Sequence, residues 1–406
     1  MRTRDLPEFV AQSDRLGGPG NPACERYWAG IEYQPDIVVD QSLDPFSDAY
    51  VDQQIALYRE MSAREFDQTS NEHTSLDVDK HVAAVNPYDH GFPGGLALHV
   101  ERLSHAIRLG APPRGSRFLD MGCGWGLSSE VAAYCGVEVT AIDVNPDFVE
   151  LVSRRAAASG NRISARTGTF DTFESDDRYA MILFYECFHH ALRPWTVLER
   201  MARHLAPKGC IVLAGEPINA IWWKHWGLRL DPLSVYCIHK FGWLESGWSA
   251  EFLAAAFARV GLSCEIVGDL AGEPGPVVIG RNVPIEQIGA DQIAKHWHHG
   301  GWFVDPNYMT GSGTSELMVP ATPTNSRTAI LGLQNFRGKP IHIDISDDEG
   351  TIVTRDLPPG RSDIEIATHR LRTKLRFSTE TWIPAQESVG TDDRKIGIHL
   401  EDVSFV

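Results

Sequence analysis

The sequence predicts an α/β protein with three parts: an N-terminal helical extension, a parallel-sheet core and a C-terminal antiparallel β-sandwich or jelly roll. Between residues 115 and 270, short apolar segments alternate with amphipathic helical segments, the pattern of a parallel sheet covered on both faces. After residue 328, six strand-like segments follow at short, regular intervals, which indicates an antiparallel sandwich. A chain of 406 residues is also too long for one ordinary domain.

The N-terminal extension is expected to cover residues 1–109 and to act as a helical cap or lid. Residues 1–40 are rich in Gly and Pro and show no clear period, whereas apolar residues spaced three and four apart predict helices between 44 and 109. Within this region, the loop 81–95 carries Tyr88 and His90. We expect both side chains to reach the substrate site from a lid.

The core is expected to span residues 110–270. Its predicted strands are 116–122, 137–143, 178–186 and 210–217, its predicted helices are 127–136, 146–160 and 195–209, and a last helix and strand fall within 249–270. An aromatic, Gly- and Pro-rich connector is expected over 271–325. The β-sandwich over 326–406 is expected to bind a glycan or to support oligomerisation.

Composition excludes some functions. The chain has 37 basic and 54 acidic residues and a formal net charge of −17, which argues against binding to a nucleic-acid backbone or an anionic membrane. Seven cysteines form no CxxC pair, the N-terminus lacks the apolar core of a signal peptide, and no apolar run is long enough to span a membrane. We therefore expect a cytoplasmic protein with reduced thiols.

A glycine-rich turn, "DMGCGWG", joins the first predicted strand to the first helix. Gly122, Gly124 and Gly126 would let a ligand approach the backbone at the start of the helix. Asp120 directly precedes the turn, where it would repel a pyrophosphate but could accept hydrogen bonds from a cationic amino-acid group. Asp143 ends the second predicted strand, the position that usually holds a ribose diol.

Five stretches in order, "LDMGCGWG", "AIDVN", "GTFDTF", "YAMILFYECFHHAL" and "LAPKGCIVLAGEP", resemble the motifs of class I S-adenosylmethionine-dependent methyltransferases. The resemblance covers about residues 110–270 and implies a Rossmann-like core with S-adenosylmethionine as cofactor. It implies that Asp120, Gly122 and Gly124 face the methionine part and that Asp143 holds the ribose. Phe170 and Asp171 would flank the adenine.

The segment "ECFHHALRP" follows the fourth predicted core strand, which borders the transferable methyl group in this fold. Transfer to a hydroxyl needs a base, and histidine titrates near working pH. We favour His190 as the base with His189 in support, although one histidine could instead only shape the pocket. Both can reach one pocket only if the chain turns after Glu186.

Two carboxylates have open roles. Glu186 is a candidate to orient a histidine or to bind a divalent ion, and Glu216 is expected at the carboxyl edge of the sheet, where it would hydrogen-bond substrate hydroxyls. No spacing specifies a metal site, so no metal ligand is assigned and a divalent ion is only an option.

An aromatic insertion follows Glu216, and Trp222 and Trp226 are expected to contact the substrate. This insertion and the C-terminal strands resemble parts of methyltransferases of bacterial polysaccharide synthesis, which favours O-methylation of a sugar hydroxyl. The alternatives are a lipid, quinone or small aromatic acceptor, or an idle glycan-binding scaffold. The expected partners are a small-molecule or oligosaccharide acceptor and further copies of the chain in a homo-oligomer.

Overall fold

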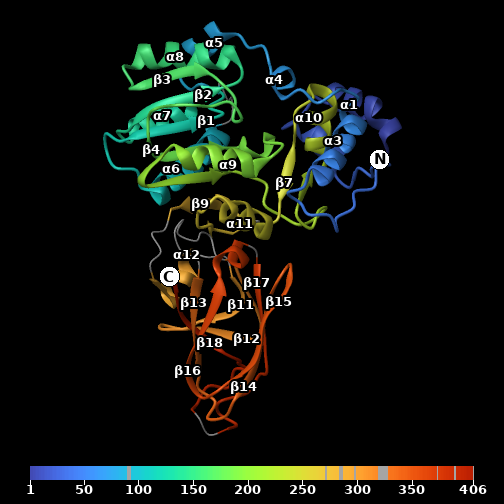
Figure 1. Ribbon diagram of the computed structural model, residues 1–406. Helices are drawn as coiled ribbons and strands as arrows, with labels where there is room; N and C mark the ends of the chain where they lie inside the picture. Colours follow the sequence, from blue (N-terminus) through green and yellow to red (C-terminus); the bar gives the residue numbers. More distant parts are fainter. Residues whose placement is uncertain are drawn as a thin grey trace. The chain divides into compact units, whose positions relative to one another are not determined.

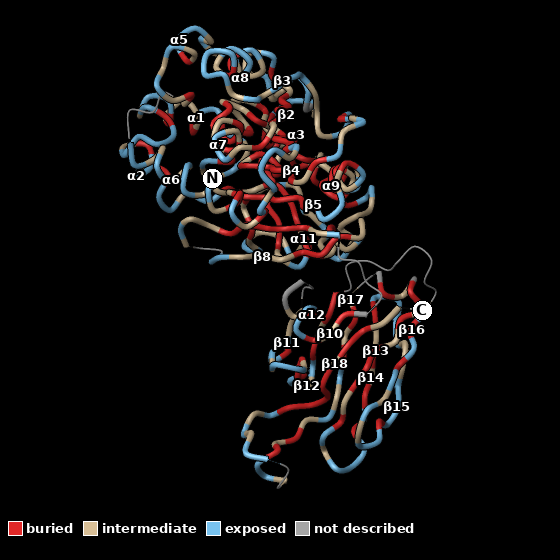
Figure 2. Tube along the Cα trace, turned by 90° about the vertical axis from the view of Figure 1, so that its left-hand side faces the viewer, coloured by how far each residue is buried: buried red, intermediate tan, exposed pale blue. Residues whose placement is uncertain are grey.

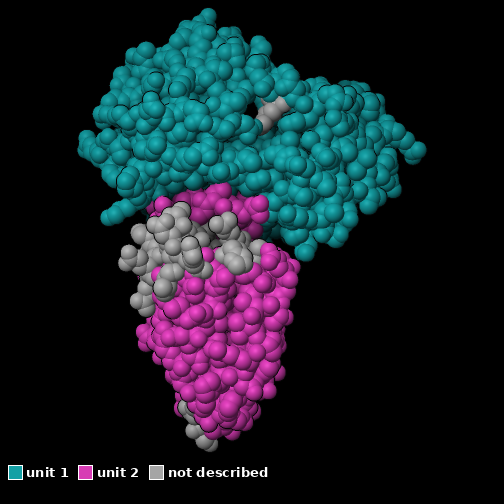
Figure 3. Space-filling model, viewed as in Figure 1, with its two compact units in different colours: residues 1–252, 266–278 teal, residues 253–265, 279–406 magenta. Residues whose placement is uncertain are grey.

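The structure is a computed structural model that describes residues 1–88, 93–269, 272–282, 287–296, 299–318, 328–372, 374–387 and 390–405. The chain forms two compact units (Figure 3), which are residues 1–252 with 266–278, and residues 253–265 with 279–406. In the second unit the strands carry most of the buried residues, whereas in the first unit the helices also bury many residues (Figure 2). The predicted fold class is confirmed: N-terminal helices, a Rossmann-like core and a C-terminal antiparallel β domain.

The N-terminal region is helical from its start. Its elements are η1 (Thr3–Asp5), α1 (Leu6–Arg15), α2 (Pro22–Trp28), α3 (Asp48–Ser62), α4 (Gln68–Asn71), α5 (Val78–Ala83) and α6 (Pro93–Gly110). No helix was predicted over residues 1–40, although Leu6, Phe9 and Ser13 of α1 are spaced three and four apart and are buried. Local signals start α2 nevertheless: Pro22 occupies its first turn, and the side chain of Asn21 accepts the N–H of Ala23.

The core sheet has the strand order β3-β2-β1-β4-β5-β9-β8 (Figure 1). Its strands are β1 (Arg117–Met121), β2 (Glu138–Asp143), β3 (Ile163–Thr167), β4 (Tyr179–Tyr185), β5 (Leu205–Ala214), β8 (Glu265–Val267) and β9 (Val277–Arg281). The pairs among β1 to β5 are parallel. The sequence did not predict β3, which is short, partly exposed and carries Ser164, Arg166 and Thr167.

Helices α6, α7 (Leu127–Tyr134), α8 (Pro146–Ser159) and α9 (Pro194–Arg203) pack against this sheet. α9 ends six residues before the predicted end at residue 209, because β5 already begins at Leu205. The insertion after β5 forms β6 (Trp226–Leu228), α10 (Pro232–Phe241) and β7 (Ser246–Trp248), and α11 (Ala250–Arg259) follows.

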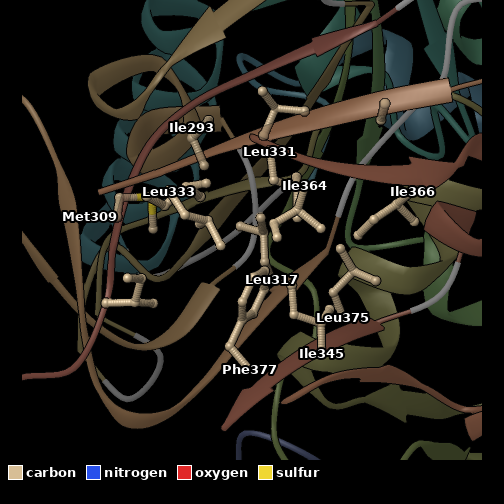
Figure 4. Packing of buried hydrophobic residues seen from close by; sticks show 14 of the residues in the cluster. Ile293, Met309, Leu317, Leu331, Leu333, Ile345, Ile364, Ile366, Leu375 and Phe377 are labelled. Carbon is tan, nitrogen blue, oxygen red and sulfur yellow. The ribbon is translucent and has the colours of Figure 1, made fainter. Parts of the chain in front are cut away.

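The second unit contains a nine-stranded sheet whose main path is β15-β14-β17-β12-β18-β13-β16. Its elements are β10 (Gln287–Gly289), α12 (Ala290–His296), β11 (His299–Val304), β12 (Met309–Met318), β13 (Thr328–Asn335), β14 (Ile341–Asp347), β15 (Gly350–Leu357), β16 (Gly360–Ala367), η3 (Thr368–Arg372), β17 (Lys374–Thr379) and β18 (His399–Phe405). Every pairing described in it is antiparallel. Figure 4 shows side chains such as Leu317, Leu333 and Phe377 meeting in its core.

The stretch expected as a connector, 271–325, is more regular than its composition indicates. It supplies β9, β10, α12, β11 and β12, and Met309 and Leu317 of β12 are fully buried. Several of the glycines that suggested irregular structure lie within strands, among them Gly301, which has a positive φ where the register of β11 against β12 shifts. A bulge of this kind lets a strand bend without ending.

Candidate active site

A cavity of about 300 Å³ lies in the first unit, at the carboxyl ends of β1 to β4. The strand order reverses between β1 and β4, which is where parallel α/β sheets usually bind their ligands. The residues lining the cavity come from the N-terminal region, the core and the insertion: Glu72, Thr74, Gly122, Gly124, Trp125, Asp143, Val144, Phe148, Gly168, Thr169, Phe170, Glu186, Cys187, His190 and Trp243.

The three glycines of the predicted cofactor turn all have positive φ values: 68° at Gly122, 46° at Gly124 and 86° at Gly126. A Cβ atom at Gly122 would lie 2.8 Å from Sγ of Cys187, whereas one at Gly124 would meet no protein atom within 4 Å. Gly122 and Gly124 line the cavity, and Gly126 lies at the start of α7. Only glycine combines this backbone with an open approach for a ligand.

Asp120 is buried at the end of β1, directly before the glycine turn. Its Oδ2 atom accepts hydrogen bonds from the hydroxyl groups of Ser128 and Ser129, at 2.7 and 2.6 Å. Among the described residues, its Oδ1 atom has no hydrogen-bond partner. Burial raises the pKa of Asp120 to about 6. A buried acceptor without a partner is the kind of group that a ligand N–H would satisfy.

Asp143 ends β2 and lines the cavity. Its Oδ2 accepts the backbone N–H of Gly124 at 2.8 Å and its Oδ1 that of Asn145 at 2.9 Å. Burial raises its pKa to about 6 as well. The carboxylate therefore fixes the glycine turn from the neighbouring strand and leaves its remaining lone pairs for a diol.

The two residues predicted to flank an adenine differ in position. Phe170 lines the cavity and packs edge-on against Phe184 of β4, with ring centroids 5.3 Å apart. Asp171 is exposed to solvent and is not among the lining residues. The structure therefore brings Gly122, Gly124, Asp143 and Phe170 together at the cavity. Asp120 is buried directly before the glycine turn and does not line the cavity, and Asp171 stays outside.

The two histidines lie beyond β4, where the chain turns. Glu186 has a φ of 51°, and Phe188–His190 form a 3-10 helix, η2. The strand alternation thus stops before the histidines, and their rings lie 4.4 Å apart. His190 lines the cavity, whereas His189 is buried behind it.

Glu216 is buried and does not line the cavity. Its carboxylate accepts the backbone N–H groups of Cys187, Phe188 and His189, at 3.0, 2.8 and 3.1 Å. Its Oε2 also lies 2.9 Å from Nδ1 of His189. The side chain predicted to bind substrate hydroxyls is therefore occupied in holding the histidine turn.

Glu72 near the histidines was not predicted, whereas Trp243 and Glu245 belong to the aromatic insertion that was expected to contact the substrate. Oε1 of Glu72 lies 3.3 Å from Nδ1 of His190, and Oε2 of Glu245 lies 3.5 Å from Nε2 of His189. Burial lowers the pKa of His190, but Glu72 and the other carboxylates outweigh burial and raise that pKa to about 9. Glu72 comes from the N-terminal region and carries no recognisable motif, so only the tertiary fold reveals it.

Glu186 lines the cavity but orients neither His189 nor His190. Its Oε1 accepts from Arg102 of α6 at 3.0 Å, and its Oε2 lies 3.7 Å from Nδ1 of His99, which is 2.6 Å from the hydroxyl of Tyr185. Arg102 also binds both carboxylate oxygens of Glu273. Of this polar group, Glu186 is the member that lines the cavity.

The predicted lid and insertion residues have mixed positions. Tyr88 stacks on His99 at 5.1 Å and lies 6.2 Å from Trp125, which places it beside the cavity; His90 lies outside the described residues. Trp226 is buried in the core, where its indole N–H donates to the carbonyl of Pro45. Trp222 packs against a hydrophobic cluster formed by the N-terminal region and the insertion, which includes Leu57 and Val235.

Comparisons with known proteins agree with this geometry. Residues 118–209 match a family model described as a methyltransferase domain. The chain is 29% identical over 197 residues to the ubiquinone biosynthesis O-methyltransferase of Azorhizobium caulinodans, covering 47% of this chain and 77% of that protein. It is 30% identical over 159 residues to the enzyme of the same name from Xanthomonas axonopodis pv. citri, covering 38% and 66%.

Several further relatives of that name are covered over less than two thirds of their length. Among solved structures, the glycopeptide N-methyltransferase MtfA complexed with sinefungin is 14% identical, with a TM-score of 0.37, and the match covers 46% of this chain and 87% of that one. A similarity of this degree carries no argument about substrate. The described helices include none that is both long and apolar enough to span a bilayer.

Proposed function

We propose that this chain, which carries a class I S-adenosylmethionine-dependent methyltransferase domain, methylates a hydroxyl group of a small aromatic acceptor of the quinone or phenol class. The observation that carries the proposal is the composition of a single cavity. It joins the glycine turn and Asp143 to several aromatic side chains and to a histidine–glutamate cluster.

The residues present fit S-adenosylmethionine. Asp143 would hold the ribose hydroxyls, the turn at Gly122 and Gly124 would admit the methionine part, and Asp120 would accept from its ammonium group. Phe170 would contact the adenine. When bound, the cofactor supplies an electrophilic methyl group on a sulfonium.

The walls of the cavity suit a flat apolar acceptor. Trp125 and Phe148 pack edge to face at 5.1 Å on one part of the wall, and Trp243 lies near His190 on another, with ring centroids 6.4 Å apart. Aromatic walls of this kind bury a ring and exclude water from it. A hydroxyl on that ring would meet the polar residues Glu72 and His190.

The chain's own residues then have separate roles. The aromatic wall orients the acceptor, which brings its oxygen in line with the methyl group. The cluster of His189, His190, Glu72 and Glu245 activates the hydroxyl, with His190 as the member that lines the cavity and Glu216 as the residue that positions the histidines.

A sugar acceptor has less support than an aromatic one. It was predicted from the aromatic insertion and from the resemblance of the insertion and the C-terminal strands to methyltransferases of polysaccharide synthesis. However, Trp226 of the insertion is buried, and Trp222 packs against a hydrophobic cluster formed by the N-terminal region and the insertion. The similar curated proteins are named for O-methylation in ubiquinone biosynthesis. A lipid, quinone or small aromatic acceptor, which the sequence left open as an alternative, is therefore better supported than a sugar.

The experiment is transfer of labelled methyl groups from S-adenosylmethionine to a panel of catechols, polyprenylated phenols and quinols, with nucleotide sugars and oligosaccharides in parallel. We expect product only with aromatic hydroxyls. Product with carbohydrates alone would reject the proposal and restore the sugar acceptor. Failure of the chain to bind S-adenosylmethionine by calorimetry would reject both.

A further inference from the structure

The histidine turn and two neighbouring segments bring two imidazoles and three carboxylates together. The members are Glu72, His189, His190, Glu216 and Glu245, and their side chains are between 1% and 18% exposed. Within the described residues, no Arg or Lys forms an ion pair with any of the three carboxylates. A buried cluster with more carboxylates than imidazoles attracts a cation, because uncompensated buried charge is costly.

Both histidines have a carboxylate next to the same ring nitrogen. Nδ1 of His189 lies 2.9 Å from Glu216, and Nδ1 of His190 lies 3.3 Å from Glu72. Histidines that bind metal ions usually donate one ring N–H to a carboxylate, which fixes the tautomer and leaves the other nitrogen for the ion. His189 has this arrangement with Glu216, and its Nε2 faces Glu245.

The spacing of the remaining donor atoms agrees with a metal site. Nε2 of His189 lies 3.5 Å from Oε2 of Glu245, which is too long for a good hydrogen bond. Two ligands of a tetrahedral zinc ion are about 3.4 Å apart, given metal–ligand distances near 2.1 Å. One donor atom from each of His189, His190 and Glu245 lies within 4.8 Å of the other two.

We infer that His189, His190 and Glu245 bind one divalent transition-metal ion of the zinc class at the edge of the active-site cavity. Imidazole nitrogen favours zinc over magnesium or calcium, which prefer oxygen ligands alone. Three protein ligands leave one position open, as in zinc sites that act in catalysis. His190 lines the cavity, so that position would be accessible to an acceptor.

The catalytic role of the ion rests on the proposed function, whereas its binding does not. An acceptor hydroxyl bound at the open position would release its proton to water, because the ion stabilises the oxyanion. The oxygen lone pair then forms the new bond to the methyl carbon. The bond from sulfur to that carbon breaks, and its electron pair returns to sulfur and neutralises the sulfonium.

The test uses the full chain, freed of metal with a chelator and titrated with ZnCl2 or MgCl2 in a calorimeter. We expect one Zn²⁺ per chain and much weaker binding of Mg²⁺. Glu245→Gln and His189→Asn should weaken Zn²⁺ binding at least tenfold, and Glu216→Gln about 10- to 100-fold through loss of the outer carboxylate. Glu251→Gln and His342→Gln, which change exposed residues elsewhere, should bind Zn²⁺ as the native chain does.

Unchanged affinity for S-adenosylmethionine in each variant will show that its domain is folded. The inference would be overturned if the native chain bound Zn²⁺ no more tightly than the Glu245→Gln variant does. Full methyl transfer by the metal-free chain would remove the catalytic role. Tight Zn²⁺ binding without transfer to any aromatic acceptor would instead retain the metal site and reject the proposed function.

Discussion

Oε2 of Glu216 lies 2.9 Å from Nδ1 of His189, and the same carboxylate accepts three consecutive backbone N–H groups of the turn that carries this histidine. Glu216 follows β5 and His189 follows β4, and these two strands are neighbours in the sheet. One buried side chain thus fixes both the backbone of the turn and the ring orientation of His189.

We therefore predict that Glu216→Gln destabilises the chain and impairs catalysis together. The glutamine amide has one acceptor oxygen. Its NH2 group would face backbone N–H groups that donate to the carboxylate in the native chain. The free energy of unfolding in urea should fall by about 1–3 kcal/mol. Methyl transfer should fall as well, whereas Glu251→Gln, an exposed change on α11, should leave both unchanged. Native turnover in Glu216→Gln would show that the histidine turn needs no such support.

Two tryptophans of the insertion should separate substrate binding from stability. Trp243 lines the cavity, so Trp243→Ala should raise the KM for an aromatic acceptor about tenfold with little effect on the affinity for S-adenosylmethionine. Trp226 is buried and donates to Pro45, so Trp226→Phe should lower the free energy of unfolding by about 1–3 kcal/mol and leave that KM unchanged. Steady-state kinetics and urea unfolding measure the two effects. A raised KM in Trp226→Phe together with a native KM in Trp243→Ala would instead indicate that the acceptor binds at Trp226.

The fold class could be predicted because the core repeats one simple pattern. Apolar strands and amphipathic helices alternate from β1 to β5, and the C-terminal strands alternate with a period of two. What the sequence did not predict departs from these patterns. β3 lacks an apolar run, and β10 to β12 are interrupted by Gly, His and Trp residues that indicate a loop.

The candidate site likewise contains residues that could be placed from sequence and residues that could not. Asp120, the glycine turn and Asp143 could be placed from sequence because they lie at fixed positions, at the carboxyl ends of β1 and β2 and in the turn that follows β1. Glu72 could not, since it approaches His190 from the distant N-terminal region. Glu245 lies in the insertion that was expected to contact the substrate, but its position beside His189 could not be predicted. Glu216 was located at the correct edge of the sheet, but its hydrogen bonds to backbone amides follow only from the turn after β4.

Two glycines provide a matched test of the cofactor turn. Gly124 and Gly160 both have positive φ, 46° and 70°, and a Cβ at either position would meet no protein atom within 4 Å. An alanine at each should therefore strain the backbone by a similar amount, about 1 kcal/mol. Only Gly124→Ala should weaken S-adenosylmethionine binding, at least tenfold, because its methyl group would enter the cavity. Equal affinity of the two variants in calorimetry would contradict a cofactor at this turn.

The affinity for S-adenosylmethionine should depend on the ionisation of Asp143. Burial raises its pKa to about 6 from an ordinary value of 3.8, and a protonated carboxyl group accepts hydrogen bonds poorly. Affinity should be constant above about pH 7 and should fall up to tenfold per pH unit below 6. Calorimetry between pH 5 and 8 measures this. Asp143→Asn should bind weakly at every pH, whereas the exposed Asp176→Asn should follow the native curve.

The raised pKa of Asp143 should make stability fall as pH rises, whereas the affinity for S-adenosylmethionine rises with pH. Between about pH 4 and 6 the folded chain holds a proton on Asp143 that the unfolded chain has lost, so the contribution of this group to the free energy of unfolding decreases as pH rises through that window. Asp143→Asn removes a group that is costly to ionise, so stability without cofactor should decline less from pH 4 to 7 than in the native chain. Urea unfolding across this range decides it, and parallel curves for the two proteins would show that Asp143 ionises as readily in the folded chain as in the unfolded one.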